Sequence, residues 1–177
     1  MFYPVWSWFW IMSLAHEVKQ AYGNWLSRYP WSWFATITLR DPLWDAGSSP
    51  PQACTGWTRM GWGKAWATWT RFTDYLGYGI FTSRDGATTV GAPGSCWWFV
   101  GLEIQERGVP HLHALLGGPA VDASWRLLAF EWAYREAGFS RLLPYDSEKG
   151  ASWYLAKYVA KELSDWRAQL PLLPWSS

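Results

Sequence analysis

The sequence has little cysteine and no surplus of either charge. Its two cysteines, Cys54 and Cys96, lie far apart and outside any CxxC pattern, which excludes a disulfide framework and a zinc ribbon. The 15 Lys and Arg residues nearly balance the 14 Asp and Glu residues, for a net charge of +1. The strong basic field that indicates nucleic-acid binding from charge alone is therefore absent, although a local patch can exist within a neutral total.

The sequence also lacks a membrane-spanning run, internal repeats and low-complexity segments. Residues 1–14 are apolar and rich in tryptophan, but a bilayer span needs about 20 apolar residues, and no basic segment of a signal peptide precedes them. We therefore expect a cytoplasmic protein with no membrane partner. One domain over residues 1–177 is expected, with a helical extension (1–30), a core (31–166) and a C-terminal tail (167–177).

Aromatic residues are what the sequence has in excess. The chain contains 18 Trp, 9 Tyr and 8 Phe, which make up 20% of its 177 residues. A chain of this length can bury a sizeable core. Its composition excludes a flexible linker and is compatible with either an aromatic core or a surface that stacks on nucleic-acid bases. We expect most tryptophans in the core.

Local patterns predict helices and strands in an irregular alternation. Helices are expected at about 12–28, 64–78, 122–137 and 148–166, strands at 32–39, 97–106, 111–117 and 140–143, and loops at 41–63 and 83–95. The turn at 107–110 joins two of the strands as a hairpin. This pattern favours an α+β fold in which helices pack against an antiparallel sheet of about five strands.

A pair of histidines is the first candidate for chemistry. His111 and His113 face the same side of a strand, because strand side chains repeat every two residues. Gln105 shares that side, and so does Glu103 if residue 103 pairs with residue 113. Two imidazoles and a carboxylate suit Mg²⁺ or Mn²⁺ acting on a phosphate, and Zn²⁺ also accepts this set. The alternative is a row of polar side chains on a solvated strand face.

A pair of tyrosines is the second candidate. Tyr154 and Tyr158 stand four residues apart in the predicted final helix, and each is followed three positions later by a lysine, Lys157 or Lys161. Helical periodicity brings these four side chains to one face. A phenol attacks a phosphodiester when a cation stabilises the developing phenolate, which either lysine could do. The alternative is that the tyrosines border the buried face of an amphipathic helix.

These residues, taken in order, resemble the three motifs of the HUH endonucleases. The segment with Phe34, Thr36 and Thr38 is similar to the first motif of that family. Pro110 to His113 is similar to the metal-binding second motif, and Glu103 stands where many relatives place a third ligand. Tyr154 to Lys161 is similar to the third motif in its two-tyrosine form.

Within that family, the sequence resembles the rolling-circle replication initiators of small plasmids and single-stranded DNA phages over about residues 31–162. The resemblance implies a ferredoxin-like or RRM-like sheet and a nickase that acts on single-stranded DNA, in some cases within a hairpin, at a replication origin. It also implies Mg²⁺ or Mn²⁺ as cofactor, a 5′-phosphotyrosine intermediate, and a host helicase and polymerase as partners. Relatives with a single KYxxK tyrosine favour Tyr158 as the first nucleophile and Tyr154 as its alternate.

Three other functions compete with this interpretation. A single-strand transposase of the HUH superfamily shares the histidine pair, but such enzymes usually have one tyrosine. A DNA-binding regulator could keep the scaffold without cutting. An unrelated zinc hydrolase would stay active after loss of both tyrosines.

Overall fold

The computed structural model describes residues 6–40, 57–78, 80–82, 88–90, 95–105, 109–123, 126–148, 150–152, 154–156 and 165–171. The helices are α1 (Trp6–Leu26), α2 (Trp57–Tyr78), α3 (Pro119–Ala123) and α4 (Arg126–Glu136). The strands are β1 (Trp33–Leu39), β2 (Ile80–Thr82), β3 (Thr88–Val90), β4 (Trp97–Ile104), β5 (Pro110–Gly117), β6 (Gly138–Pro144) and β7 (Trp166–Gln169). Residues 151–152 and 154–156 are also helical.

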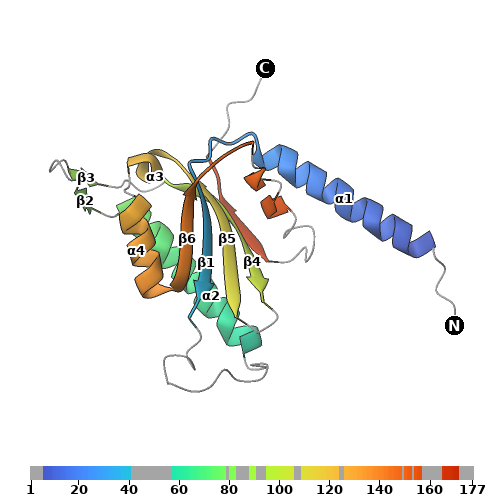
Figure 1. Ribbon diagram of the computed structural model, residues 1–177, viewed down its shortest axis with the longest axis horizontal. Helices are drawn as coiled ribbons and strands as arrows, with labels where there is room; N and C mark the ends of the chain where they lie inside the picture. The colour runs from blue at the N-terminus through green and yellow to red at the C-terminus, as the bar shows by residue number, and fades with distance from the viewer. Residues whose placement is uncertain are drawn as a thin grey trace.

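Five strands form one antiparallel sheet in the order β6-β1-β5-β4-β7 (Figure 1). Strands β2 and β3 form a separate two-stranded sheet. Without that small sheet and the edge strand β7, the chain runs βαββαβ, with α2 and α4 as the connecting helices. This is the ferredoxin-like arrangement. The predicted α+β fold with a five-stranded antiparallel sheet is confirmed.

One face of the sheet is covered by α2, α3 and α4. Alternate strand residues point to this face, and aliphatic side chains occupy it almost without interruption. Trp69 and Phe72 of α2 pack against them and are fully buried. The core on this face includes Ala35, Ile37, Val100, Leu102, Ala114, Leu112, Leu116 and Leu142.

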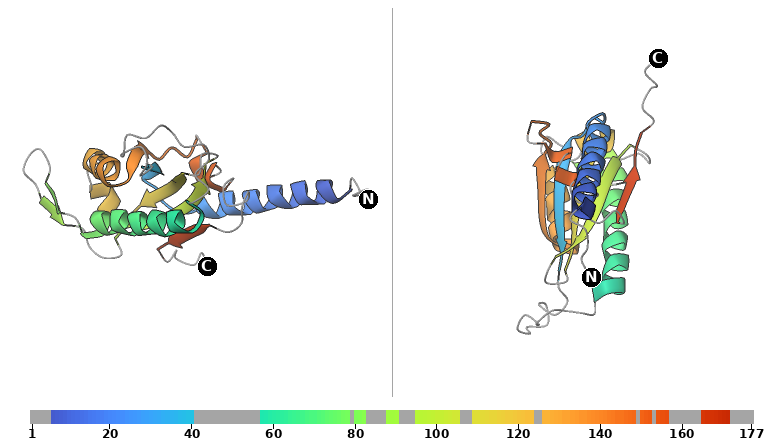
Figure 2. Two further views of the ribbon diagram at one scale, coloured as in Figure 1. Left: turned by 90° about the horizontal axis from the view of Figure 1, so that it is seen from below. Right: turned by 90° about the vertical axis from the view of Figure 1, so that its right-hand side faces the viewer.

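The opposite face is only partly covered. A second buried cluster joins α1 and the helical residues 151–152 and 154–156 to the sheet, and it consists of Leu26, Trp31, Phe99, Leu115 and Leu155. Toward its N-terminal end, α1 continues past the sheet (Figure 2). The remaining part of this face carries polar side chains, including the two histidines.

Two helices begin earlier than the sequence predicts. Helix α1 spans Trp6–Leu26 instead of residues 12–28, and α2 begins at Trp57, inside the predicted loop at 41–63. Glycines near the start of α2 indicated a loop, since each glycine costs about 1 kcal/mol in a helix. Trp62 and Trp66 nevertheless pack against the core, and this burial extends the helix.

The predicted helix at 122–137 is also wrong in detail. The described residues form two helices there, α3 and α4, and the first begins earlier, at Pro119. Proline is favoured at the first position of a helix because its missing N–H has no helical partner there. Similarly, the predicted loop at 83–95 contains β3, which pairs with β2.

The largest error concerns the end of the chain. A final helix reaching residue 166 is wrong, because Trp166–Gln169 form β7 and pair with β4. Residues 167–169 of the predicted tail therefore belong to the sheet. The Trp166 ring stacks on Phe99 at 5.2 Å between ring centroids, and Leu102 N–H donates to the Asp165 carbonyl at 2.8 Å. These contacts with β4 favour the strand over continued helix.

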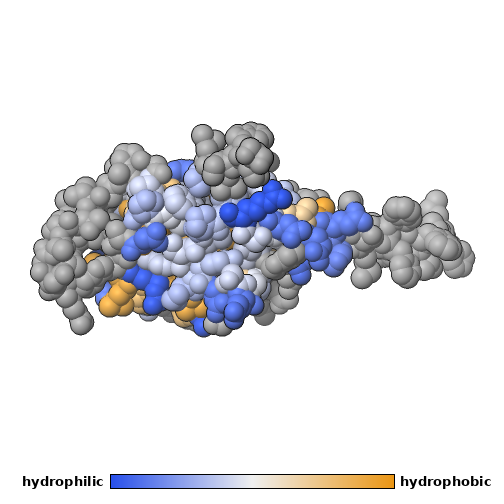
Figure 3. All heavy atoms as spheres, turned by 90° about the horizontal axis from the view of Figure 1, so that it is seen from above, coloured by the Kyte–Doolittle hydropathy of each residue, from blue (hydrophilic) through white to orange (hydrophobic). Residues whose placement is uncertain are grey.

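On the face shown in Figure 3, the described residues are mostly hydrophilic or intermediate in hydropathy. In Figure 3, hydrophobic residues on the face that is shown form only small, separate patches. Within the part of the chain that the structure describes, no helix is long and apolar enough to cross a membrane.

Candidate functional site

Strand register brings the predicted metal ligands to one end of the partly covered sheet face. Glu103 and Thr38 both pair with His111, from β4 and β1 respectively. His113 pairs with Gly101 and Thr36 in the next row of that face. The pairing of residue 103 with residue 113, on which the metal prediction depended, is therefore wrong by one row.

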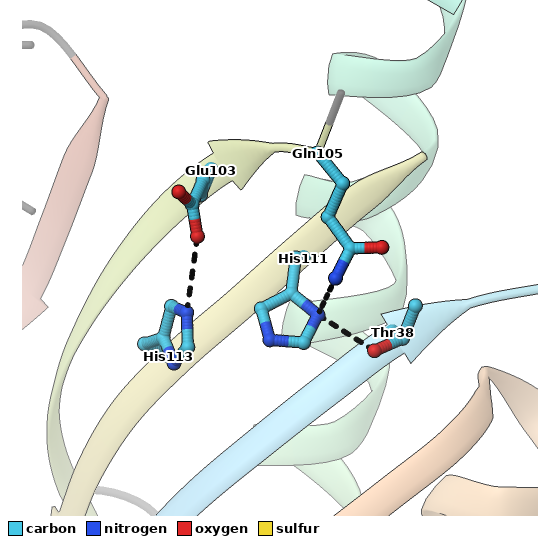
Figure 4. Close-up of polar contacts among 5 residues, drawn as sticks. All are labelled: Thr38, Glu103, Gln105, His111 and His113. Carbon is cyan, nitrogen blue, oxygen red and sulfur yellow. Dashed lines mark hydrogen bonds and ion pairs between the residues drawn. The ribbon is translucent and has the colours of Figure 1, made fainter. Parts of the chain in front are cut away.

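Glu103 nevertheless reaches His113 diagonally. Its Oε2 lies 3.4 Å from Nε2 of His113 (Figure 4). Gly101, directly opposite His113, contributes no side chain of its own to this row, and strand side chains lean along the strand direction. The site therefore joins two rows of the sheet.

His113 is neutral at pH 7. Burial lowers the pKa of its imidazole to about 4, and the residue is only 3% exposed. A buried imidazole resists protonation because the charged form loses its hydration. The contact with Glu103 is therefore a hydrogen bond in which Nε2–H donates to a carboxylate oxygen.

Two polar side chains contact Nδ1 of His111. The Thr38 hydroxyl lies 2.6 Å from Nδ1, and the Gln105 amide nitrogen lies 3.3 Å from the same atom (Figure 4). The rings of His111 and His113 are 4.4 Å apart between centroids. When Nδ1–H donates to the Thr38 hydroxyl oxygen, Nε2 keeps its lone pair and the ring is oriented for metal binding through that nitrogen.

These donors suit a divalent metal only in part. The 3.4 Å between Glu103 Oε2 and His113 Nε2 is close to the ~3.3 Å that separates two ligands at tetrahedral angles and metal bonds of about 2.0–2.1 Å. Within the described residues, however, no three His, Cys, Asp or Glu side chains form a group that could hold a metal ion. The residue types therefore suit a divalent metal, but only Glu103 and His113 lie at ligand spacing, with His111 beside them.

Tyr154 lies directly against this group. Its ring meets His113 edge to face at 5.6 Å between centroids, and it meets Phe34 in the same way at 5.8 Å. Tyr154 remains 43% exposed. A predicted nucleophile and a predicted metal ligand are thus in contact, although about 40 residues separate them in the sequence.

Local contacts fix the helical segment that carries Tyr154. Leu155 is fully buried in the second core cluster. The hydroxyls of Tyr145 and Ser152 are hydrogen-bonded at 2.8 Å. Gly150 precedes the segment with φ of 65°, a left-handed conformation that glycine adopts without strain. Burial of the neighbouring Leu155 therefore holds Tyr154 over β1.

The first-motif residues have distinct positions. Phe34 contacts both Tyr154 and His113, since its ring is stacked on the His113 ring at 6.5 Å. Thr38 bonds to His111, and Thr36 is the register partner of His113. Lys157, Tyr158 and Lys161 lie outside the described residues.

Two residues on this face were not anticipated from the sequence. Phe139 and Arg141 of β6 are exposed and pair with Thr38 and Thr36. Their alternation with buried Ser140 and Leu142 was the available signal. It did not indicate a site, because nothing in the sequence shows that β6 adjoins β1.

Comparison with known proteins adds little. No protein-family model and no curated protein matches the chain. A matching solved structure is the N-terminal nuclease domain of non-structural protein 1 from minute virus of mice. It has 11% sequence identity and a TM-score of 0.24, with 94% of this chain and 75% of that chain covered. That domain coordinates Zn²⁺ in its active-site pocket and recognises DNA at the replication origin. A similarity this low carries no argument about the present chain.

Proposed function

We propose that this protein is a tyrosine nickase and strand transferase of the HUH type, which cleaves single-stranded DNA at a replication origin. The observation that carries the proposal is the contact of the Tyr154 ring with His113, beside Glu103 and His111. Separate segments thereby bring a phenol, two imidazoles and a carboxylate together at an accessible position on the sheet. The resemblance of the three sequence motifs supports the same chemistry.

In the proposed reaction, the phenol oxygen of Tyr154 or Tyr158 bonds to the phosphorus of the scissile phosphodiester. The bond from phosphorus to the 3′ oxygen breaks, the phenol loses its proton, and the leaving oxygen becomes a 3′-hydroxyl. One phosphodiester replaces another, so no nucleotide is consumed and the step can be reversed to religate the strand. Lys157 and Lys161 are proposed to stabilise the phenolate or hold the phosphate.

Glu103, His111 and His113 are proposed to hold Mg²⁺ or Mn²⁺, which would polarise the scissile phosphate when bound. Thr38 keeps His111 oriented through Nδ1. His113 would bind through Nε2 as the neutral tautomer that carries its proton on Nδ1, so metal binding at this residue releases no net proton near pH 7. Phe34 packs against Tyr154 and limits where its ring can lie.

The direct test is an adduct assay. The protein is incubated with Mn²⁺ and single-stranded oligonucleotides from its own replicon, and covalent protein–DNA species are separated on a denaturing gel. We expect an adduct that disappears in the double variant Tyr154→Phe/Tyr158→Phe and weakens in His111→Ala and His113→Ala. The matched control is Tyr22→Phe, which removes the hydroxyl of a tyrosine whose ring packs against Trp25 of α1 and Trp166 of β7.

Two of the competing functions give different results in this assay. A DNA-binding regulator would bind the oligonucleotides and form no adduct with any variant. A zinc hydrolase would cleave a substrate after both tyrosines are replaced. An adduct that survives in the double tyrosine variant would overturn the proposed mechanism.

A further inference from the structure

The outer strand of the sheet presents an exposed aromatic ring and an arginine beside the candidate site. Phe139 is 66% exposed, more than any other large hydrophobic side chain in the described part of the chain. Arg141, two residues along β6, points to the same face and is also exposed. An exposed aromatic ring and an arginine on one strand face are the two kinds of group that bind single-stranded nucleic acid, by stacking on a base and by pairing with a phosphate.

The sheet register connects this pair to the catalytic candidates. Phe139 is opposite Thr38, which is opposite His111. Arg141 is opposite Thr36, which is opposite His113. Two strand spacings, about 9.5 Å, therefore separate β6 from the histidine strand. A few nucleotides cover that distance, roughly three when bases stack at 3.4 Å.

The open edge of β6 is poorly suited to pairing with a strand of a binding partner. The Arg126 guanidinium donates to the Leu142 carbonyl at 2.7 Å, and β6 ends at Pro144, which has no N–H. Both features hinder the addition of a β-strand to an open edge. A ligand at this position would use the side chains on the face of the sheet.

We propose that Phe139 and Arg141 bind single-stranded DNA next to the scissile phosphate, with a base stacked on the Phe139 ring and a backbone phosphate on Arg141. This inference rests on the proposed function. With a net charge of +1, the chain lacks the general attraction to DNA that a basic protein has. Stacking and a locally placed arginine then have to supply much of the affinity.

The test measures binding apart from cleavage. A fluorescein-labelled thymine single strand of about 20 nucleotides, longer than the ~4–16 nucleotides that single-strand-binding domains cover, is titrated with protein in EDTA and followed by anisotropy. We expect Phe139→Ala to weaken binding by roughly 5- to 100-fold, as for loss of one stacked base, and Phe139→Trp to restore it. We expect Arg141→Gln to weaken binding and to reduce its salt dependence.

The matched control comes from a helix that covers the other face. Arg71→Gln removes an arginine side chain that is 57% exposed on α2. This variant should bind the thymine strand as the unmodified protein does. Equal affinity of Phe139→Ala and the unmodified protein, or equal competition by a duplex of the same length, would overturn the inference.

The adduct assay separates this inference from the proposed function. If the unmodified protein forms the adduct but Phe139→Ala binds normally, the binding site is wrong and the nickase stands. If no adduct forms while Phe139→Ala and Arg141→Gln bind more weakly, the nickase is wrong and the binding site stands. If the unmodified protein neither binds nor forms an adduct, both are overturned.

Discussion

At the scale of single residues, His113 is both buried and a candidate metal ligand. The sequence was enough to predict that His111 and His113 share one strand face, because side chains alternate along a strand. The burial of His113 and its diagonal contact with Glu103 could not be predicted, since they depend on the register of β4 with β5 and on the absence of a side chain at Gly101. The Thr38 contact likewise needed the pairing of β1 with β5.

The lowered pKa of His113 predicts how the metal-free protein responds to acid. Its folded pKa of about 4 lies below the ordinary value of about 6.5, so the unfolded chain binds a proton that the folded chain does not. Stability is therefore lost as pH falls from about 6.5 towards 4. Denaturant unfolding in EDTA should show a loss of about 2 kcal/mol between pH 7 and pH 5 from this residue.

The variant His113→Gln isolates that effect from the other titrating groups. It should unfold with a shallower dependence of free energy on pH over the same range. An unchanged slope would show that His113 titrates normally in the folded protein.

Thr38 predicts a separate effect on metal affinity. Thr38→Val keeps the shape of the side chain and removes its hydrogen bond to His111, so Mn²⁺ binding measured by calorimetry should weaken by about 10- to 100-fold. Thr36→Val, on the same strand face opposite His113, is the control and should bind Mn²⁺ nearly as tightly. Equal losses of Mn²⁺ affinity in the two variants would show that Thr38 does not orient His111.

At the scale of helices and strands, elements with a regular alternation of apolar residues were predicted from the sequence. Elements fixed by contacts with distant parts of the chain were not. The strands at 33–39, 97–104 and 110–117 were close to prediction because apolar residues alternate along them. Strand β7 was not predicted. Trp166 fits the helical spacing that starts at Leu155, yet stacking on Phe99 and pairing with β4 place it in the sheet.

Two glycines test how the ends of elements are fixed. Gly118, which follows β5, has φ of 108°, and an added Cβ would collide with the Ser95 carbonyl and the Trp97 ring. Gly118→Ala should therefore lower the free energy of unfolding by about 1–3 kcal/mol or more. Gly63→Ala is the control because a Cβ there meets nothing within 4 Å, and within α2 it should raise stability by about 0.5–1 kcal/mol. In thermal unfolding, the melting temperature should fall for Gly118→Ala and rise for Gly63→Ala. Changes of the same sign in both variants would contradict these roles of the two glycines.

For the whole molecule, the fold class was predictable and the assembly of the site was not. Hairpin pairing and alternating helices were enough to indicate an antiparallel α+β sheet. Contact of Tyr154 with His113 requires that the segment at 150–156 lie over β1, and no local pattern encodes that placement. It depends on Leu155 in the second core cluster and on the Tyr145–Ser152 hydrogen bond.

The most direct measurement of the central claim is to locate the covalent bond. The adduct formed with Mn²⁺ and a single-stranded origin oligonucleotide is trimmed with nuclease, digested with protease and analysed by mass spectrometry. The proposed mechanism predicts a nucleotide attached through a 5′ phosphate to Tyr154 or Tyr158. A nucleotide attached to any other residue, or cleavage of the oligonucleotide without a tyrosine-linked product, would contradict it.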